Sequence, residues 1–109
     1  MITIKRGATL RRILLWRNAA TKVPVNLAGQ TIYGQVRDAT RVFVSTITIN
    51  QLDQMLNAGK AHADFGNTKL WPVGTVYFDF VREVPHSDGA ITVYSKTAAI
   101  KVERGITDV

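Results

Sequence analysis

The chain of 109 residues contains no cysteine, only three prolines, and no long apolar run. Without cysteine it can form no disulfide bond, no thiolate metal site and no cysteine nucleophile. No apolar stretch approaches the roughly 18 residues that a membrane helix needs, so we expect no membrane contact. Met1 leads into Ile-Thr-Ile-Lys-Arg rather than a secretory signal. These absences predict a single soluble domain over residues 1–109, made in a reducing cytoplasm.

Acidic residues are scarce in the first part of the chain. Residues 1–41 hold eight Lys and Arg against one acid, Asp38, a net charge of +7. Residues 42–109 hold six basic and seven acidic residues, so the whole net charge of +6 arises before residue 42. Such asymmetry indicates either a nucleic-acid or acidic partner, or strands whose Lys and Arg face solvent and deter edge-to-edge pairing. We favour the second interpretation.

Apolar and polar residues alternate between turn residues along most of the chain, a pattern typical of short antiparallel strands. Between residues 9 and 17, one face carries Leu10, Arg12, Leu14 and Trp16, and the other carries Ile13 and Leu15 with Arg11 and Arg17. Because both faces are partly apolar, we expect this strand to be central in its sheet or covered by a partner.

Later segments carry further strand predictions. Gly34 is expected to make room for a large neighbour such as Trp16, or to mark a bulge. In residues 76–84, Val76, Phe78 and Phe80 are predicted to point inward. A bulge near Ser45 would keep four apolar residues inward, namely Val42, Val44, Ile47 and Ile49. The last strand, residues 91–102, has a predicted inward set of Tyr94, Ala98, Ile100 and Val102.

Residues 50–59 change period. Leu52, Met55 and Leu56 recur at helical spacing, with Asn50 as a candidate N-cap and Gly59 as a candidate C-terminal stop. The spacing predicts one to two turns of helix near residues 51–58.

Little in the sequence points to catalysis. Two His-x-Asp pairs, His62 with Asp64 and His86 with Asp88, could each offer a nitrogen and an oxygen to a metal. Turn and edge-strand roles explain these residues better, and Ser87 cannot form a relay with its immediate neighbours. No Gly-rich phosphate loop is present. We therefore predict no enzyme, catalytic residue, cofactor, metal site or small-molecule substrate.

The first 38 residues carry a recognisable order of strands and turns. A short strand and Arg-Gly-Ala-Thr precede an alternating strand that ends in Trp. Pro-Val-Asn-Leu-Ala-Gly and a strand ending in Arg-Asp follow. The residues that carry the pattern are Arg6, Gly7, Thr9, Trp16, Pro24, Asn26, Leu27, Gly29, Arg37 and Asp38. This order resembles the amino-terminal immunoglobulin-like domain of phage upper baseplate proteins and related small tail domains. Ala8 departs from their usual Asp or Asn, so the turn there lacks a side-chain hydrogen bond.

The resemblance implies an immunoglobulin-like antiparallel β-sandwich of about seven strands, besides the short helical turn. It also implies a structural protein of the virion, made in the host bacterial cytoplasm. The protein would belong to the tail, baseplate or head–tail region and act by assembly with other virion proteins and with copies of itself. The alternatives are a capsid decoration protein and a small nucleic-acid-binding β-barrel. The barrel would use Arg11, Arg17, Arg37 and Arg41 with Tyr33, but these bases sit singly, so nucleic acid is not favoured.

Aromatic residues and arginine are enriched at the centres of protein interfaces. On that basis, and on the exposed face predicted for residues 9–17, we expect partner contacts at Arg11, Ile13, Leu15, Arg17, Tyr33, Leu70, Trp71 and Tyr77. Tyr33 is expected near Ile13 and Leu15. The alternative for Trp71 is a core position that closes one end of the domain.

Overall fold

The structure is a computed structural model that describes residues 2–18 and 20–106. Within these residues it contains no helix and eight strands: β1 (Ile2–Lys5), β2 (Thr9–Leu15), β3 (Thr31–Asp38), β4 (Phe43–Gln51), β5 (Lys60–Asn67), β6 (Gly74–Val84), β7 (Ile91–Tyr94) and β8 (Ala98–Glu103). The all-β prediction is confirmed. The strand count differs from about seven because the predicted last strand is interrupted at residues 95–97.

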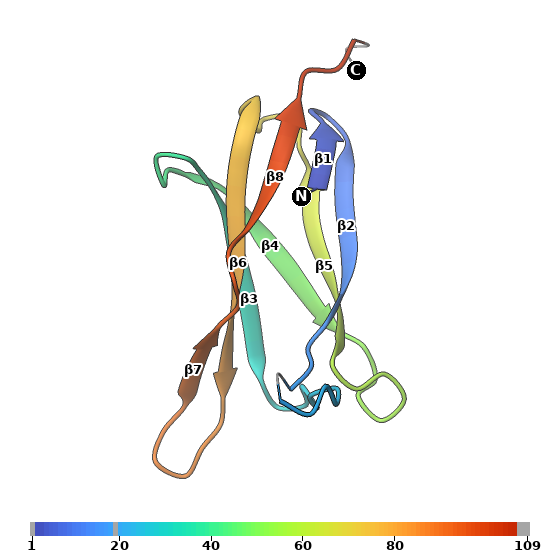
Figure 1. The fold of residues 1–109 in the computed structure, drawn as a ribbon, viewed down its shortest axis with the longest axis vertical. Helices are drawn as coiled ribbons and strands as arrows, with labels where there is room; N and C mark the ends of the chain where they lie inside the picture. Colours follow the sequence, from blue (N-terminus) through green and yellow to red (C-terminus); the bar gives the residue numbers. More distant parts are fainter. Residues whose placement is uncertain (1, 19, 107–109) are drawn as a thin grey trace.

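The eight strands form one strongly bent sheet in the order β1-β8-β6-β3-β4-β5-β2, and β7 pairs with the far end of β6. The bend lies in β4, whose first half pairs with β3 and whose second half pairs with β5. All pairs are antiparallel except β1 with β8. The two end strands, β1 and β2, are consecutive in sequence, so a short turn brings the two ends of the sheet close together. The result is nearly a barrel (Figure 1).

The core lies inside this bend and receives side chains from both halves of the sheet. Phe65 of β5 meets Phe78 of β6 edge to face, with ring centroids 5.1 Å apart, and Trp16 meets Phe80 at 5.8 Å. The predicted inward positions Val76, Phe78, Phe80, Ile100 and Val102 are all buried. Period-two alternation therefore located the core face of β6 and of the end of β8 correctly.

Two predictions about close packing are settled here. Gly34 sits opposite Phe80 in the ladder, and a Cβ atom on Gly34 would lie 2.8 Å from the Asp79 carbonyl oxygen and 2.9 Å from the Phe80 ring. The large neighbour is thus Phe80 and not Trp16. In β4 the register shifts beside Phe43, which keeps Val44, Ile47 and Ile49 on the core side. Val42 instead lies exposed in the turn before the strand.

The turn from β1 to β2 is held by a residue from elsewhere in the chain. Gly7 has a φ of 100°, which favours glycine. The Thr68 hydroxyl accepts a hydrogen bond from the Gly7 N–H at 3.0 Å and donates one to the Ala8 carbonyl at 2.8 Å. Thr68 is fully buried. The Thr68 side chain therefore supplies the side-chain hydrogen bond to this turn that Ala8, in place of Asp or Asn, cannot make.

The structure does not show the helical turn predicted near residues 51–58. The segment is a series of turns with one helix-like bond, from the Asn57 N–H to the Asp53 carbonyl. The loop is organised by Gln54, whose Oε1 accepts from the N–H groups of Leu27 and Gly59. Met55 is 93% exposed. Leu56 is 84% exposed as well, whereas Leu52 is partly buried, so the three residues do not form one buried face.

The predicted inward positions Tyr94 and Ala98 are also exposed. At Ser95 the strand leaves its regular ladder, and the Ser95 hydroxyl accepts from the Phe80 N–H at 2.8 Å. Tyr94 lies before this break and belongs to the outer face, whereas Ile100 and Val102 lie after it and face the core. The break shifts the phase of alternation between the two halves of the predicted strand.

Candidate functional site

The predicted contact residues of β2 lie together on the outside of the domain. Ile13 is 63% exposed and Leu15 is 40% exposed, while Leu10 on the opposite face is buried in the core. The assignment of the two faces is therefore confirmed for Leu10, Ile13 and Leu15, whereas Arg12, which was placed on the core-side face, is exposed. Of the two alternatives for this strand, central in its sheet or covered by a partner, the central position is wrong, because β2 is the last strand of the sheet and pairs only with β5.

The free edge of β2 offers backbone groups as well as side chains. Trp16, the residue after β2, donates its N–H to the Gly59 carbonyl at 2.8 Å, so its amide faces β5. Amide and carbonyl groups alternate between the two sides of an antiparallel strand. Those of Ile13 and Leu15 therefore point away from β5. No described strand pairs with that side, so a partner strand could hydrogen-bond there.

The surroundings of this edge are basic. Arg11 and Arg12 are both exposed, and Lys60 lies opposite Leu15 in the ladder. The Arg11 side chain contacts Asp64 at 3.4 Å, an exposed ion pair of about 0–1 kcal/mol. Asp64 is the one acidic residue among the β2 and β5 strands. The edge thus combines apolar side chains, open backbone groups and positive charge.

Tyr33 and Tyr77 do not join this surface. They lie on β3 and β6, in the other half of the sheet. Three strand boundaries separate β3 from β2, so the expectation that Tyr33 lies near Ile13 and Leu15 is wrong. The Tyr33 hydroxyl donates to the Glu83 carboxylate at 3.2 Å. Partial desolvation, with this hydrogen bond second, raises the pKa of the Tyr33 phenol.

Tyr77 lines an open hollow of about 520 Å³ beside the turn between β3 and β4. Arg37, Arg41 and Asp79 line the same hollow. The Arg37 guanidinium is fixed by bonds to the Arg41 carbonyl at 3.0 Å and to the Gln35 amide oxygen at 2.8 Å. Asp38 also lines it, so two arginines face two aspartates and the hollow has no net charge of one sign. It is a mixed polar recess without a reactive arrangement.

The remaining predicted contact residues lie in different parts of the domain. Trp71 is 3% exposed and belongs to the core, so its assignment to a partner surface is corrected to the alternative core position. Its neighbour Leu70 is 94% exposed in the loop between β5 and β6. Arg17 follows β2, is exposed, and forms an isolated bridge with Pro24.

The sequence did not predict the exposed surface of β7. β7 and the end of β6 form a two-stranded arm that projects from the body of the domain at the lower left of Figure 1. All four residues of β7 are exposed, and Tyr94 is 67% exposed. The uninterrupted run Ile-Thr-Val-Tyr, with no charged residue, was the available signal.

Within residues 2–18 and 20–106, no group of three or more His, Asp or Glu side chains is placed to hold a metal ion. The same residues include no helix long and apolar enough to cross a bilayer. No protein-family model and no curated protein matches the chain.

Proposed function

We propose that this protein is a structural component of a phage particle, in the tail, baseplate or head–tail region, and that it acts by assembly. The observation that carries the proposal is the edge of β2. Ile13 and Leu15 are exposed there beside unpaired backbone groups. Burying such apolar area gains about 25 cal/mol per Å², and a neighbouring virion protein is the cover we infer.

The phage context rests on the resemblance of residues 6–38, and the roles of those residues support it. Leu27 is fully buried, and the Asn26 side chain accepts from the Ala28 N–H at 2.9 Å to shape the turn before β3. Asp38 closes the turn after β3 through three hydrogen bonds, two from Thr40 and one from Val42. The motif is thus made of turn and core residues, which suits a shared fold rather than a shared catalytic site.

We also propose that the fold is of the immunoglobulin-like sandwich type. The support is the way the bent sheet divides: β2 and β5 face β6 and β8 across the core, with β4 passing between the two halves. Core residues come from both sides, Leu10 and Phe65 on one and Val76 and Ile100 on the other. A two-layer core of this kind is what a sandwich requires.

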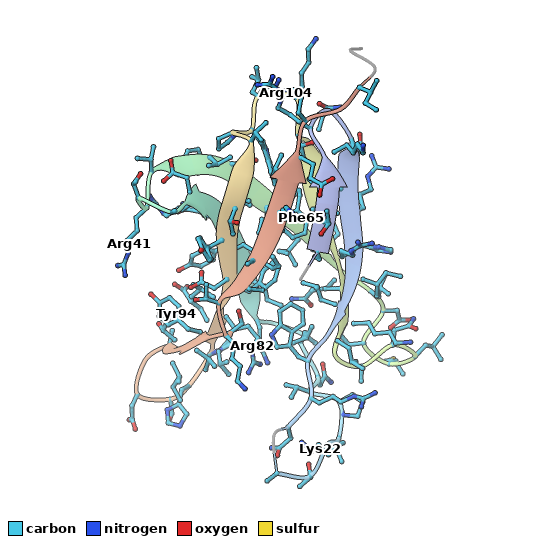
Figure 2. The ribbon with its side chains drawn as sticks, turned by 45° about the horizontal axis from the view of Figure 1, so that its top comes forward. Lys22, Arg41, Phe65, Arg82, Tyr94 and Arg104 are labelled. Carbon is cyan, nitrogen blue, oxygen red and sulfur yellow. The ribbon has the colours of Figure 1, made fainter. Side chains whose placement is uncertain are left out.

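The distribution of basic residues argues against the nucleic-acid alternative. Lys22, Arg41 and Arg104 lie at three separate corners of the domain (Figure 2). A nucleic-acid site would gather them in one groove that follows the phosphate backbone. Dispersed bases between exposed apolar residues favour protein contacts. A capsid decoration protein stays the alternative within the same class.

The proposal is tested on particles. Mass spectrometry of purified phage particles from the source of this gene should detect the protein. Changing Ile13 and Leu15 together to Ser should leave the purified domain folded, because both side chains are exposed, and should block its incorporation. A matched control is Val42→Ser, which alters an apolar residue of similar exposure in the turn between β3 and β4, outside the predicted contacts, and should be incorporated normally.

Two outcomes would contradict the proposal. Absence of the protein from purified particles would remove the structural role itself. Normal incorporation of the Ile13 and Leu15 double variant would remove β2 as the contact while leaving the role in place. Circular dichroism of the variant separates either result from simple unfolding.

A further inference from the structure

The arm carries another open sheet edge, β7, which differs in composition and charge from β2. Its two strands pair from Val81 with Tyr94 to Val84 with Ile91, and no described strand pairs with the other side of β7. Figure 1 shows this side facing away from the body. An edge of this kind presents a row of unpaired backbone donors and acceptors.

The outward backbone groups of β7 can be assigned. Ser95, the residue after β7, donates its N–H to the Phe80 carbonyl at 2.8 Å, so its amide faces β6. By alternation the amides of Ile91 and Val93 also face β6. Those of Thr92 and Tyr94 point to the free edge. None of the four residues is charged, and three of them are β-branched, which favours strand pairing.

We propose that β7 pairs with β7 of a second copy of this chain, antiparallel and about a two-fold axis at Val93. Thr92 of each copy then lies opposite Tyr94 of the other, so the outward amides and carbonyls bond to one another. The result is a continuous four-stranded sheet, β6-β7-β7-β6. This inference rests on the proposed assembly role and adds which segment joins two copies.

The two faces of that sheet are compatible with the pairing. A two-fold axis perpendicular to the sheet keeps like faces together, so Ile91 and Val93 of both copies share one face. Tyr94 and Thr92 share the other, and Figure 2 shows Tyr94 and Arg82 on opposite sides of the arm. Cross-strand pairs of β-branched and aromatic residues are favourable, and no like charges are opposed on β7.

The net charge of the arm favours a second copy of this chain over an acidic partner at the β7 edge. Residues 81–95 hold one basic residue, Arg82, and two acids, Glu83 and Asp88, a net charge of −1 with neutral histidine. Because the whole chain carries +6, the rest of it carries +7. Two copies repel least where they meet through their arms. Because each arm projects from its body, the two basic bodies stay apart.

The absence of cysteine makes a direct test available. Position 93 forms a non-hydrogen-bonded pair on the two-fold axis, so the cysteines that V93C introduces in two copies would be close enough for a disulfide. The variant V93C, oxidised under mild conditions, should form a covalent dimer as the main product on a non-reducing gel. The matched variant I13C places cysteine on the other open edge and should stay monomeric. Sedimentation velocity of the unmodified protein should show a concentration-dependent dimer.

A monomer at every concentration, with no cross-linking of V93C above the I13C level, would overturn the pairing. Equal cross-linking of both variants would overturn it as well, since that indicates random collision. Circular dichroism of V93C checks that the arm has not unfolded the domain, and T92C gives a second position on β7 if it has. These outcomes concern the purified protein, so they are independent of whether it is found in particles.

Discussion

Two of the open edges of this sheet, β2 and β7, differ in charge and in the strands that support them. β2 belongs to the body: Leu10 packs in the core, Arg11 and Arg12 lie exposed, and β5 supports it along its length. β7 belongs to the arm, has no charged residue, and pairs with only the last four residues of β6. Each edge leaves backbone groups unpaired, but only β2 carries charges that would oppose those of an identical strand.

This difference separates two kinds of assembly contact. Two β2 strands side by side would bring their arginines together, so the basic edge selects against a second copy and for an acidic or neutral neighbour. The β7 edge carries no charge that would repel an identical strand, so two β7 strands can pair. A small domain with one edge of each kind can be doubled through its arm and attached to another protein through its body.

The largest expected effect tests whether the body folds independently of the arm. Trp71→Ala removes a buried aromatic from the core and should lower the free energy of unfolding by about 3–5 kcal/mol. Tyr94→Ala removes an exposed aromatic from the arm and should change it by less than about 0.5 kcal/mol. Urea unfolding followed by circular dichroism measures both. A destabilisation by Tyr94→Ala as large as that by Trp71→Ala would show that arm and body are one unit.

Much of the core was predictable because it depends on local alternation. Val76, Phe78 and Phe80 follow period two without interruption, and a strand central in a sheet keeps that phase. The outward position of Ile13 and Leu15 was predictable for the same reason. Neighbouring residues in a loop gave no such signal: Leu70 and Trp71 are adjacent and both apolar, yet one is exposed and the other is buried.

What could not be predicted depends on pairing between distant segments. The edge position of β2 follows from the strand order of the whole sheet, which no local pattern encodes. Tyr94 was placed inward because the break at Ser95, which inverts the phase, leaves no mark in the alternation. The helical spacing of Leu52, Met55 and Leu56 was misleading because the loop is shaped instead by the Gln54 side chain, which bonds to the Leu27 and Gly59 N–H groups and to the Leu52 and Lys60 carbonyls.

The next prediction concerns a charge introduced on β7, the uncharged edge. Thr92→Lys places a charge on β7 where an identical strand would bring a second one close. Lysine on an edge strand is a common natural block to pairing. We expect dimerisation to weaken at least tenfold, roughly 1.4 kcal/mol, in sedimentation velocity.

The control for this variant is Gln35→Lys, which also adds one positive charge, at an exposed position of β3 that pairs with Thr46 of β4 on one side and with Asp79 of β6 on the other. It adds the same charge to the protein without touching an edge. Equal weakening by both lysines would mean that net charge, and not the β7 edge, governs association.

A smaller effect is expected at the basic edge. Arg12→Thr removes one charge from β2 and leaves the Arg11–Asp64 ion pair intact. In the Thr92→Lys background, where β7 is blocked, we expect weak self-association to emerge, of the order of a few-fold above that of the Thr92→Lys protein. Arg12→Lys in the same background keeps the charge and should show no such gain. If Arg12→Thr also shows no gain in self-association, the shape of the strand, such as the register shift beside Leu10, and not its charge prevents two β2 edges from pairing.

The smallest expected effect lies in the turn between β3 and β4, far along the chain from both edges. Asp38 accepts hydrogen bonds from the Thr40 hydroxyl at 2.7 Å and from the Thr40 and Val42 N–H groups at 2.9 Å. The hydroxyl bond, followed by the Val42 amide bond, lowers the pKa of Asp38 below its ordinary value of 3.8. A carboxylate with a lowered pKa in the folded state stabilises the protein above its unfolded-state pKa.

That stabilisation should disappear as the pH falls below about 3.8 and through the lower pKa of the folded protein. Asp38→Asn keeps an acceptor oxygen but cannot ionise, so the variant should show a slightly flatter loss of stability in acid and the same dimerisation as the unmodified protein at neutral pH. Thermal unfolding from about pH 2 to pH 7 and sedimentation at about pH 7 measure the two properties. Because the turn touches neither β2 nor β7, a change in dimerisation in this variant would mean that the edges are coupled through the sheet, and the separation between body and arm contacts would no longer hold.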